Sequence, residues 1–179
     1  RVAIVTGAGG GLGRCNAREL ARRGAKVVIN GLGASMDGSG GNSAAAEAVV
    51  KEIEAMGGEA MANGSSVADE AGVKKMIDDT MARFGQIDIL IANAGILRDK
   101  SFSKMTQADI DLVIDVHLRG SFMPIHAAWD IMKAQNYGRI VVTTSSTGLY
   151  GNFGQANYGA AKLGLVGMMN TLKIEGAKN

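Results

Sequence analysis

The chain alternates short apolar runs with longer helical patterns along almost its whole length, and this alternation limits the possible folds more than any other feature. Apolar runs that predict strands occupy residues 2–6, 26–30, 59–62, 87–95 and 138–146. Helical spacing of apolar residues predicts helices over residues 12–24, 44–58, 69–85, 107–134 and 156–177. Strands that alternate with helices through short connections pair in parallel, with helices on both faces of the sheet. The sequence therefore predicts an α/β protein with a Rossmann-type, doubly wound parallel sheet.

Two local signals refine these helix boundaries. Ser43 is predicted to cap the helix that begins after it, because a serine oxygen at that position accepts a hydrogen bond from the first turn. Pro124, the one proline of the chain, lacks a backbone N–H and is predicted to kink or break the helix over residues 107–134.

The number of strands bears on domain organisation. The first three strands and their helices would form one mononucleotide-binding half, and the second half supplies two strands, whereas a complete sheet of this type has six. We therefore expect residues 1–179 to be one dinucleotide-binding domain truncated at its C-terminus, whose native chain continues for roughly 60–80 residues. The first residue is Arg1 and not methionine, so the native N-terminus is also expected to be missing.

Composition argues against several classes of partner. Basic residues number 19 and acidic residues 17, they are interspersed, and aromatic residues make up only 4%, which argues against a nucleic-acid surface. No apolar run approaches the roughly 20 residues that span a bilayer, so no membrane partner is expected. The single cysteine, Cys15, cannot form an internal disulfide and fits a reducing compartment such as the cytoplasm.

Glycine is abundant, with 26 residues, and it concentrates in the stretches 7–13, 31–41 and 148–167. We interpret the first stretch as a phosphate-binding loop and the third as part of an active site. The middle stretch has two interpretations, a flexible excursion of the chain or a low-complexity linker.

The first glycine stretch, TGAGGGLG, joins the first predicted strand to the first predicted helix. Its glycines follow the pattern T-G-x-x-x-G-x-G, and no set of them follows G-x-G-x-x-G. Such glycines allow a tight turn, a close approach of the backbone to a diphosphate, and close packing of helix on strand, and the free N–H groups at the helix start favour the same anion. The predicted cofactor-binding residues of this loop are Thr6, Gly7, Gly11, Leu12 and Gly13. The alternative is a glycine-rich turn that serves packing alone.

The residue that should grip the adenosine ribose is missing. An NAD site commonly has an acidic residue about 20 residues after the loop, and that position is Gly31. No basic residue for the 2′-phosphate of NADP is present either, because Gly10 and Leu32 are both neutral. Asp37 could swing back to the ribose, or it could be an ordinary solvated loop residue.

Tyr158 and Lys162 stand four residues apart on one predicted helix, so their side chains share a face. A free phenol has a pKa near 10, and a neighbouring ammonium favours the phenolate, which makes the phenol a useful acid or base. Ser145 lies at the end of the last predicted strand, where such sheets bind ligands, and can donate a hydrogen bond to a substrate oxygen. The alternative is a tyrosine packed on the sheet and a lysine that reaches past it to solvent.

The glycine loop, the NAG sequence after the fourth strand, Ser145, Tyr158 and Lys162 occur together, in order and at consistent spacings. This set resembles the short-chain dehydrogenase/reductase family, and the resemblance covers essentially all 179 residues. The segments NAGILRDKSF, VHLRGSF and YGNFGQANY look like the (3R)-hydroxyacyl-CoA dehydrogenase domains of peroxisomal multifunctional enzymes and their bacterial relatives.

The resemblance implies a role for each matching residue. It makes Tyr158 the general acid/base, Ser145 the group that orients and polarises the substrate oxygen, and Lys162 the group that lowers the tyrosine pKa and holds the nicotinamide ribose. It also implies that the NAG turn lies beside the cofactor. That turn consists of Asn93, Ala94 and Gly95.

Three positions depart from the pattern of the family. Gly31 stands in place of the expected aspartate, and Ser65 stands where the family often has an aspartate at the adenine. His117 occupies the position at which most of the wider family has an asparagine that supports a proton relay. It is either a variant of that residue or a histidine packed in its helix.

The resemblance implies an oxidoreductase that transfers a hydride between NAD (or NADP) and a secondary alcohol or ketone, with a (3R)-hydroxyacyl or 3-oxoacyl thioester as substrate. Within the same class, the alternative is an NADPH-dependent 3-oxoacyl-carrier-protein reductase or another alcohol/ketone reductase. A different class is a dinucleotide-binding regulator without turnover. No metal site is expected, and the implied location is the cytoplasm, or the peroxisome in a eukaryote.

The last predicted helix points to self-association. Between Asn157 and Asn170 its only charged residue is Lys162, so apolar side chains surround its axis, and such a helix is buried on more than one side. The small residues that would let a second helix approach are Gly159, Ala160, Gly164 and Gly167. We therefore expect a homodimer or homotetramer in which this helix and the 107–134 helix meet their symmetry mates.

Overall fold

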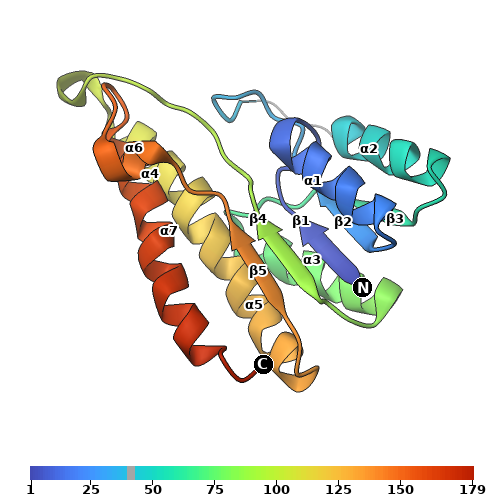
Figure 1. Cartoon of the computed structure of the whole chain (residues 1–179). Helices are drawn as coiled ribbons and strands as arrows, with labels where there is room; N and C mark the ends of the chain where they lie inside the picture. Colours follow the sequence, from blue (N-terminus) through green and yellow to red (C-terminus); the bar gives the residue numbers. More distant parts are fainter. Residues whose placement is uncertain (40–42) are drawn as a thin grey trace.

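Five parallel strands form one sheet, in the order β3-β2-β1-β4-β5. The computed structural model describes residues 1–39 and 43–179, so part of the glycine stretch 31–41 lies outside the described residues. The strands are β1 (Val2–Val5), β2 (Lys26–Asn30), β3 (Ala60–Asn63), β4 (Ile89–Ala92) and β5 (Arg139–Val142). Their order and direction confirm the predicted doubly wound α/β sheet, which the chain builds outward from β1 on both sides (Figure 1).

Helices cover both faces of this sheet. They are α1 (Gly11–Arg22), α2 (Ala44–Ala55), α3 (Glu70–Phe84), α4 (Gln107–Ile114), α5 (Gly120–Ala134), α6 (Ser146–Tyr150) and α7 (Ala156–Glu175). A short 3₁₀ turn, η1 (Phe102–Lys104), precedes α4, and a π-helical turn, η2 (Asp115–Arg119), joins α4 to α5. α1 and α2 pack on one face, and α3, α5 and α7 pack on the other (Figure 1).

Alternation along the central strands divides the core into two clusters. In β1, Ile4 faces α3, α5 and α7, whereas Val5 faces α1 and α2, and both side chains are fully buried. Successive side chains of a strand point to opposite faces, so a strand that is covered on both faces is apolar at most of its positions. This explains why the strand signals in the sequence are continuous apolar runs.

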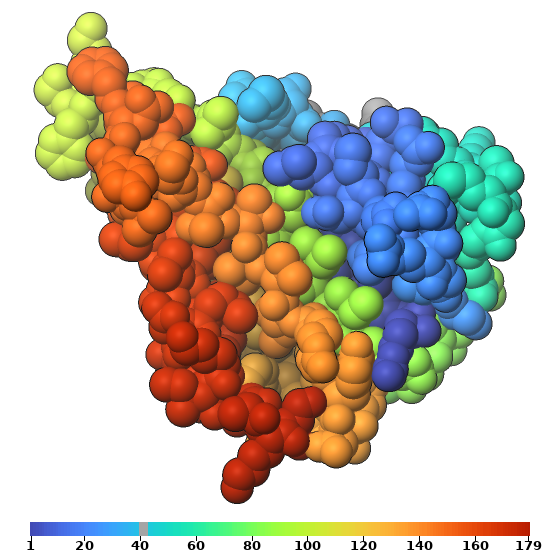
Figure 2. All heavy atoms as spheres, in the orientation of Figure 1, coloured from blue at the N-terminus to red at the C-terminus, as the bar shows by residue number. Residues whose placement is uncertain are grey.

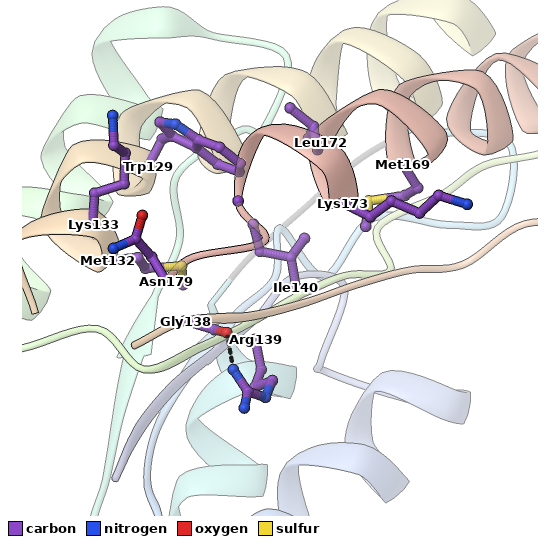
Figure 3. A pocket seen from close by; sticks show the side chains of 11 residues that line it. Trp129, Met132, Lys133, Gly138, Arg139, Ile140, Met169, Leu172, Lys173 and Asn179 are labelled. Carbon is purple, nitrogen blue, oxygen red and sulfur yellow. Dashed lines mark hydrogen bonds between the residues drawn. The ribbon is translucent and has the colours of Figure 1, made fainter. Parts of the chain in front are cut away.

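β5 differs from its neighbours because it forms the edge of the sheet and is only partly covered. Val141 pairs with Ile91 on the face that α1 and α2 cover elsewhere, yet Val141 is 50% exposed whereas Ile91 is buried. The region around β5 (orange) is open to solvent beside α1 (Figure 2). A cavity of about 160 Å³ lies between β5 and the C-terminal parts of α5 and α7, lined among others by Trp129, Ile140 and Leu172 (Figure 3).

The cap predicted at Ser43 was wrong, and the break in the helix predicted over 107–134 lies before Pro124 and not at it. Ser43 precedes α2, but its backbone is already helical (φ −74°, ψ −6°), and its hydroxyl donates to the Glu47 carboxylate (2.7 Å) instead of capping the first turn. Pro124 lies buried within α5 without ending it. The helix predicted over 107–134 is interrupted earlier, by η2. The proline cannot donate to the carbonyl of Gly120, and the π-helical turn ends next to that residue.

The last predicted strand is shorter than expected. It ends at Val142 instead of residue 146, and α6 follows, which the sequence did not predict. The segment STGLY gives little helical signal, because serine, threonine and glycine all have low helix propensity. Ser145 therefore does not end a strand but immediately precedes α6.

Packing of α7 corrects part of the expectation about its small residues. A Cβ at Gly164 would lie 3.0 Å from Leu118 of η2, and one at Gly159 would lie 3.3 Å from the carbonyl oxygen of Thr147 in α6. These two glycines therefore allow close packing inside the chain and not the approach of a second helix. Gly167, where a Cβ would meet nothing within 4 Å, faces outward.

No helix within residues 1–39 and 43–179 is both long enough and apolar enough to cross a membrane.

Candidate active site

The glycine loop joins β1 to α1, and its glycines serve two different purposes. A Cβ at Gly7 (φ +62°) would lie 2.7 Å from the Cα of Ala94, and a Cβ at Gly13 would lie 2.2 Å from the carbonyl oxygen of Gly7. These positions require glycine because the NAG turn and α1 pack directly against the loop. Gly11 requires glycine for its backbone (φ +50°), but a Cβ there would meet nothing within 4 Å. The space beside Gly11 can therefore admit a ligand.

The N-terminus of α1 borders this space and has the features of an anion site. Its N-cap residue, Gly10, has no side chain that could cap the first turn, and that turn contains no acidic residue. Leu12, in the same turn, is 69% exposed. The first N–H groups of a helix lack partners within it, and the helix dipole favours negative charge there. The loop therefore fits the diphosphate of a dinucleotide, which backbone groups would hold.

The side chains of Thr6 and Asn93 connect the glycine loop to the NAG turn. The Thr6 hydroxyl accepts the N–H groups of Asn93 (2.9 Å) and Ala94 (3.0 Å). The Asn93 carboxamide donates in return to the carbonyl oxygens of Thr6 (3.1 Å) and Gly7 (3.2 Å). Both residues were predicted to bind the cofactor, but in this structure their side chains hold the NAG turn against the glycine loop. They thus fix the two walls of the crevice relative to each other.

At the expected adenosine end of the site, Gly31 and Ser65 both form backbone hydrogen bonds within the fold. The Gly31 N–H donates to the Asn63 carbonyl (3.0 Å), and a Cβ at Gly31 would lie 3.3 Å from the nitrogen of Gly9. The Ser65 N–H donates to the Asn63 side chain (3.0 Å), and its carbonyl accepts from the Asn30 side chain (2.9 Å). This asparagine pair was not predicted from the sequence, although each asparagine ends an apolar strand and that position was a usable signal.

Asp37 behaves as a solvated loop residue. It is exposed, and its carboxylate accepts from the hydroxyl (2.7 Å) and the N–H (2.9 Å) of Ser39, which lower the pKa of Asp37. Its backbone carbonyl accepts from Arg98 (2.7 Å). The two ends of the residue are therefore engaged locally, and the alternative in which it swings back to the ribose is not what the structure shows.

Lys162 lies on the buried face of α7. It is 3% exposed, and its ammonium donates to the carbonyl of Thr143, just after β5. The same ammonium lies 5.5 Å from the centre of the Tyr158 ring. Burial lowers the pKa of Lys162 to about 8, so the group is still mainly charged at pH 7. The lysine does not reach past the tyrosine to solvent, because a backbone carbonyl holds its charge inside.

Ser145 is the N-cap of α6, and its hydroxyl oxygen accepts the N–H of Thr147 (3.2 Å). That bond uses the oxygen as an acceptor and leaves the hydroxyl proton free to be donated. Two contacts, neither of them predicted from the sequence, hold α6 beside α7. Thr144 donates to the carbonyl of Lys162 (2.8 Å), and a Cβ at Gly148 would lie 2.9 Å from the nitrogen of Leu163.

His117 lies in η2 and is packed between the NAG turn and Tyr158. Its ring meets the Tyr158 ring edge to face, with centres 5.1 Å apart, and a Cβ at Gly95 would lie 2.5 Å from its Cε1. Nε2 lies 2.7 Å from the carbonyl oxygen of Ile96 and 3.1 Å from its nitrogen. Burial, aided by the charge of Lys162, lowers the pKa of His117 to about 4, so the ring is neutral at pH 7.

The comparison with protein families agrees with this geometry. A model described as short chain dehydrogenase matches residues 1–179. The chain belongs to the short-chain dehydrogenase family. It is 57% identical over 179 residues to the peroxisomal multifunctional enzyme type 2 of Mus musculus, and 43% identical over 175 residues to a 3-oxoacyl-[acyl-carrier-protein] reductase of Synechocystis. The crystal structure of a short chain dehydrogenase from Mycobacterium avium superposes with a TM-score of 0.84 at 45% identity.

These alignments cover almost all of this chain but only part of the length of each relative. The whole chain aligns with the mouse enzyme but spans 24% of that enzyme's length, and 98% of it aligns with 68% of the Synechocystis reductase. The crystal structure matches 99% of this chain, which spans 62% of that chain. The resemblance predicted from the sequence motifs is confirmed for the family and for its peroxisomal multifunctional members.

Among the described residues, no three His, Cys, Asp or Glu side chains are grouped so that they could hold a metal ion.

Proposed function

We propose that this chain supplies the dinucleotide-binding and proton-transfer parts of an oxidoreductase that interconverts (3R)-hydroxyacyl and 3-oxoacyl thioesters with NAD. The observation that carries the proposal is the buried ammonium of Lys162, held at the end of β5 and beside the ring of Tyr158. A buried cation next to a phenol costs desolvation energy and does little for packing, whereas it serves proton transfer well. The resemblance of the segments NAGILRDKSF, VHLRGSF and YGNFGQANY to (3R)-hydroxyacyl-CoA dehydrogenase domains supports the thioester as substrate class.

Different residues of the chain would perform different steps of the reaction. Bound NAD+ would supply the hydride acceptor, with its diphosphate at the start of α1. The Ser145 hydroxyl would donate to the substrate oxygen, since its own oxygen already accepts from Thr147. The Tyr158 side chain, as phenolate, would take the alcohol proton and become the phenol as the hydride leaves, and the Lys162 ammonium would stabilise the phenolate charge before that transfer. The NAG turn and the glycine loop would hold the cofactor from both sides.

For the cofactor we propose NAD over NADP, by a small ratio. Neither Gly31 nor Leu32, which follow β2, is a cation that could pair with a 2′-phosphate. Nothing at these positions repels a phosphate either, so the discrimination should be weak.

A second candidate is an NADPH-dependent 3-oxoacyl-carrier-protein reductase, which the similarity to the Synechocystis enzyme favours. A dinucleotide-binding regulator is the candidate from another class. The test is a turnover screen of the full-length protein with NAD+ and NADP+ against (3R)-hydroxyacyl-CoAs, and with NADPH against 3-oxoacyl carrier protein. Turnover only in the second arm would replace the main proposal, and cofactor binding without any turnover would favour the regulator.

We also propose a homodimer or homotetramer in which α5 and α7 meet their symmetry mates. Both helices keep large apolar side chains at the surface, including Phe122 (47% exposed) and Leu163 (46% exposed). Such side chains on neighbouring helices are typical of a contact surface. Light scattering of the full-length protein at micromolar concentration should give at least a dimer, and a monomer would contradict this assembly.

We further propose that residues 1–179 belong to a larger domain whose sheet continues past β5, in a cytoplasmic or peroxisomal enzyme. The half exposure of Val141 supports this, because strands of parallel sheets are normally covered on both faces. The segment 1–179 alone should oxidise substrate far more slowly than the full-length protein. Equal rates would show that the described residues make a complete site.

A further inference from the structure

The first turn of α7, which carries Tyr158, is not capped by its N-cap residue. Gln155 makes no side-chain hydrogen bond to the turn, and its carboxamide instead donates to Asp99 (2.7 Å) and accepts from Thr147 (3.1 Å). The first N–H groups of a helix have no partners within it. The N–H of Tyr158 is one of these, and it donates to the side-chain oxygen of Asn157 (2.8 Å). The turn is therefore capped from inside, by the residue directly before the tyrosine.

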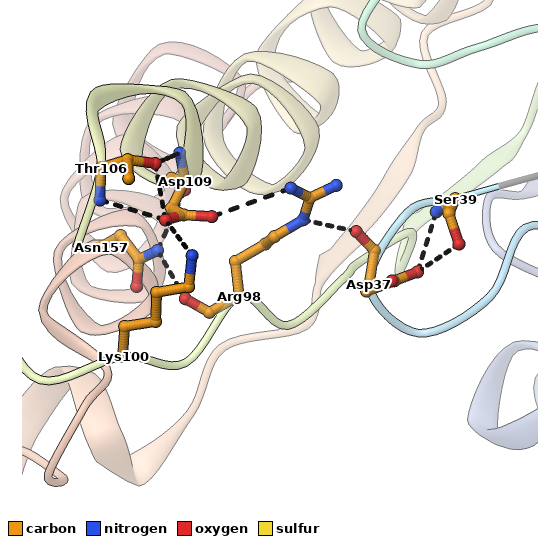
Figure 4. Close-up of polar contacts among 7 residues, drawn as sticks. All are labelled: Asp37, Ser39, Arg98, Lys100, Thr106, Asp109 and Asn157. Atoms are coloured by element: carbon orange, nitrogen blue, oxygen red, sulfur yellow. Dashed lines mark hydrogen bonds and ion pairs between the residues drawn. The ribbon is translucent and has the colours of Figure 1, made fainter. Parts of the chain in front are cut away.

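The other end of the Asn157 side chain is fixed by two different elements. Its amide nitrogen donates to the carbonyl of Asp109 in α4 (3.0 Å) and to the carbonyl of Arg98, after the NAG turn (3.3 Å) (Figure 4). The side chain is buried, with the residue 4% exposed. An asparagine side chain has one acceptor and two N–H donors, and here both kinds of group are engaged at once. Its orientation is therefore fixed by its neighbour Tyr158 and by two carbonyls that lie about 50 or 60 residues earlier in the sequence.

The segments that Asn157 binds are themselves clamped together around Asp109. The buried carboxylate of Asp109 accepts from Lys100 (2.9 Å) and from the hydroxyl (2.6 Å) and N–H (3.0 Å) of Thr106. Its other oxygen lies 3.7 Å from the guanidinium of Arg98. Lys100 and Thr106 hold the pKa of Asp109 well below its usual range, so the carboxylate is charged at neutral pH. The carbonyls that anchor Asn157 thus belong to a cross-linked wall and not to loose loops.

We propose that Asn157 is a positioning residue that fixes the phenol of Tyr158 relative to the segment 98–100. This inference rests on the proposed function, because it assigns the residue a task in that reaction. Asn157 acts through the backbone of Tyr158. A first helical turn whose amides lack partners frays readily, and a displacement of about 1 Å at a reacting group can cost about 100-fold in rate.

The test uses two substitutions in the full-length protein. Asn157→Asp keeps the size and the acceptor for Tyr158, but it removes both donated bonds and turns an oxygen toward two carbonyls. Asn157→Ser removes the same bonds without adding charge. With NAD+ and a (3R)-hydroxyacyl-CoA we expect kcat to fall about 10- to 100-fold, while the KM for NAD+ and the dissociation constant of NADH change less than about twofold. The control is Gln107→Ala, which removes an exposed carboxamide from the first turn of α4 and should leave kcat unchanged.

Two results with folded variants would overturn the inference. One is a kcat within about twofold of wild type, and the other is a fall in kcat matched by an equal loss of NADH affinity, which indicates a general structural role. A measurement on the wild type tests the cap on which the inference depends, without any variant. The Tyr158 amide should exchange its hydrogen at least about tenfold more slowly than the amide of Ala156, the first residue of α7, and equal rates overturn the inference. Absence of turnover in the wild type would count against the proposed function alone.

Discussion

The two halves of the sheet are built on different principles. The half with β1, β2 and β3 offers its ligand mainly backbone, namely the open space at Gly11 and the first amides of α1. The half with β4 and β5 offers side chains, and hydrogen bonds between distant segments hold them in place. Lys162 donates to the carbonyl of Thr143. The Asn157 side chain donates to the carbonyls of Arg98 and Asp109 and accepts the N–H of Tyr158.

This difference teaches where each half is vulnerable. Recognition by backbone groups depends on the shape of the loop, so a larger side chain in the half with β1, β2 and β3 should weaken cofactor binding even when no functional group is lost. Side-chain chemistry depends on single atoms, so the second half should lose turnover when one polar atom is removed at constant shape. Substitutions that separate binding from turnover can therefore test the comparison directly.

The largest expected effect comes from Tyr158→Phe in the full-length protein. The change removes one hydroxyl and little packing, so kcat should fall by about 10³-fold or more while the dissociation constant of NADH stays within about twofold. Tyr150→Phe is the matched control, because Tyr150 is 85% exposed. Retention of most of the turnover by Tyr158→Phe would remove this residue from the mechanism and erase the contrast between the halves.

Gly13→Ala tests the first half by adding volume alone. The new Cβ would lie 2.2 Å from the carbonyl oxygen of Gly7, so the loop or α1 must shift. We expect a loss of about 3 kcal/mol in the free energy of unfolding and at least tenfold weaker NADH binding. Gly10→Ala, where a Cβ meets nothing within 4 Å, should change the free energy of unfolding by less than about 1 kcal/mol. Equal effects of the two substitutions on denaturant unfolding would show that loop shape is not limiting.

His117→Asn should change how stability depends on pH. The folded-state pKa of about 4 lies below the ordinary value of 6.5, so between these values the unfolded chain binds a proton that the folded protein does not. Stability should therefore fall as the pH drops from about 6.5 to about 4, by up to about 3 kcal/mol, and level off below.

Removal of the buried histidine should flatten that decline, as measured by denaturant unfolding across the pH range. His126→Asn is the control, since His126 is the other histidine of the chain and is exposed on α5. A decline that persists unchanged in His117→Asn would assign the acid sensitivity to other groups.

The smallest expected effect is that of Gly31→Asp on cofactor choice. A carboxylate at the end of β2 should repel a 2′-phosphate and grip the ribose hydroxyls, which should raise the preference for NAD over NADP several-fold. Because a Cβ there lies 3.3 Å from the nitrogen of Gly9, part of the gain will be offset by a small shift of the loop. Steady-state kinetics with both cofactors measure the ratio, and a shift toward NADP would mean that the ribose lies elsewhere.

The sequence was sufficient to predict what depends on local pattern. Continuous apolar runs predicted all five strands, because a strand that is buried on both faces is largely apolar, and the alternation of strands with helices predicted their parallel arrangement. The glycine spacing predicted a tight turn and close packing of helix on strand, which fits the positive φ of Gly7 (+62°) and the close contact at Gly13, whereas the contact of Gly7 with Ala94 was not predicted.

The remaining features depend on contacts between distant segments, which local patterns do not encode. The interruption at η2 and the short helix α6 are stabilised by packing against α7 and not by propensity. The link from Asn157 to Arg98 and Asp109 joins positions about 50 or 60 residues apart, so nothing near any one of them indicated the others. Gly31 and Ser65 stay predicted cofactor residues, and the part that the carboxamides of Asn30 and Asn63 play in that corner is known only from the structure.

The cavity beside β5 contains the one tryptophan of the chain, Trp129. It lies near the start of β5, at the end of the strand opposite to Ser145. The wavelength of the tryptophan emission therefore reports on the surroundings of this corner. A segment or subunit that covers the edge of the sheet should exclude water from the indole and shift its emission to shorter wavelength. The emission wavelength of Trp129 is thus an optical probe for cover over this corner, independent of any measurement of turnover.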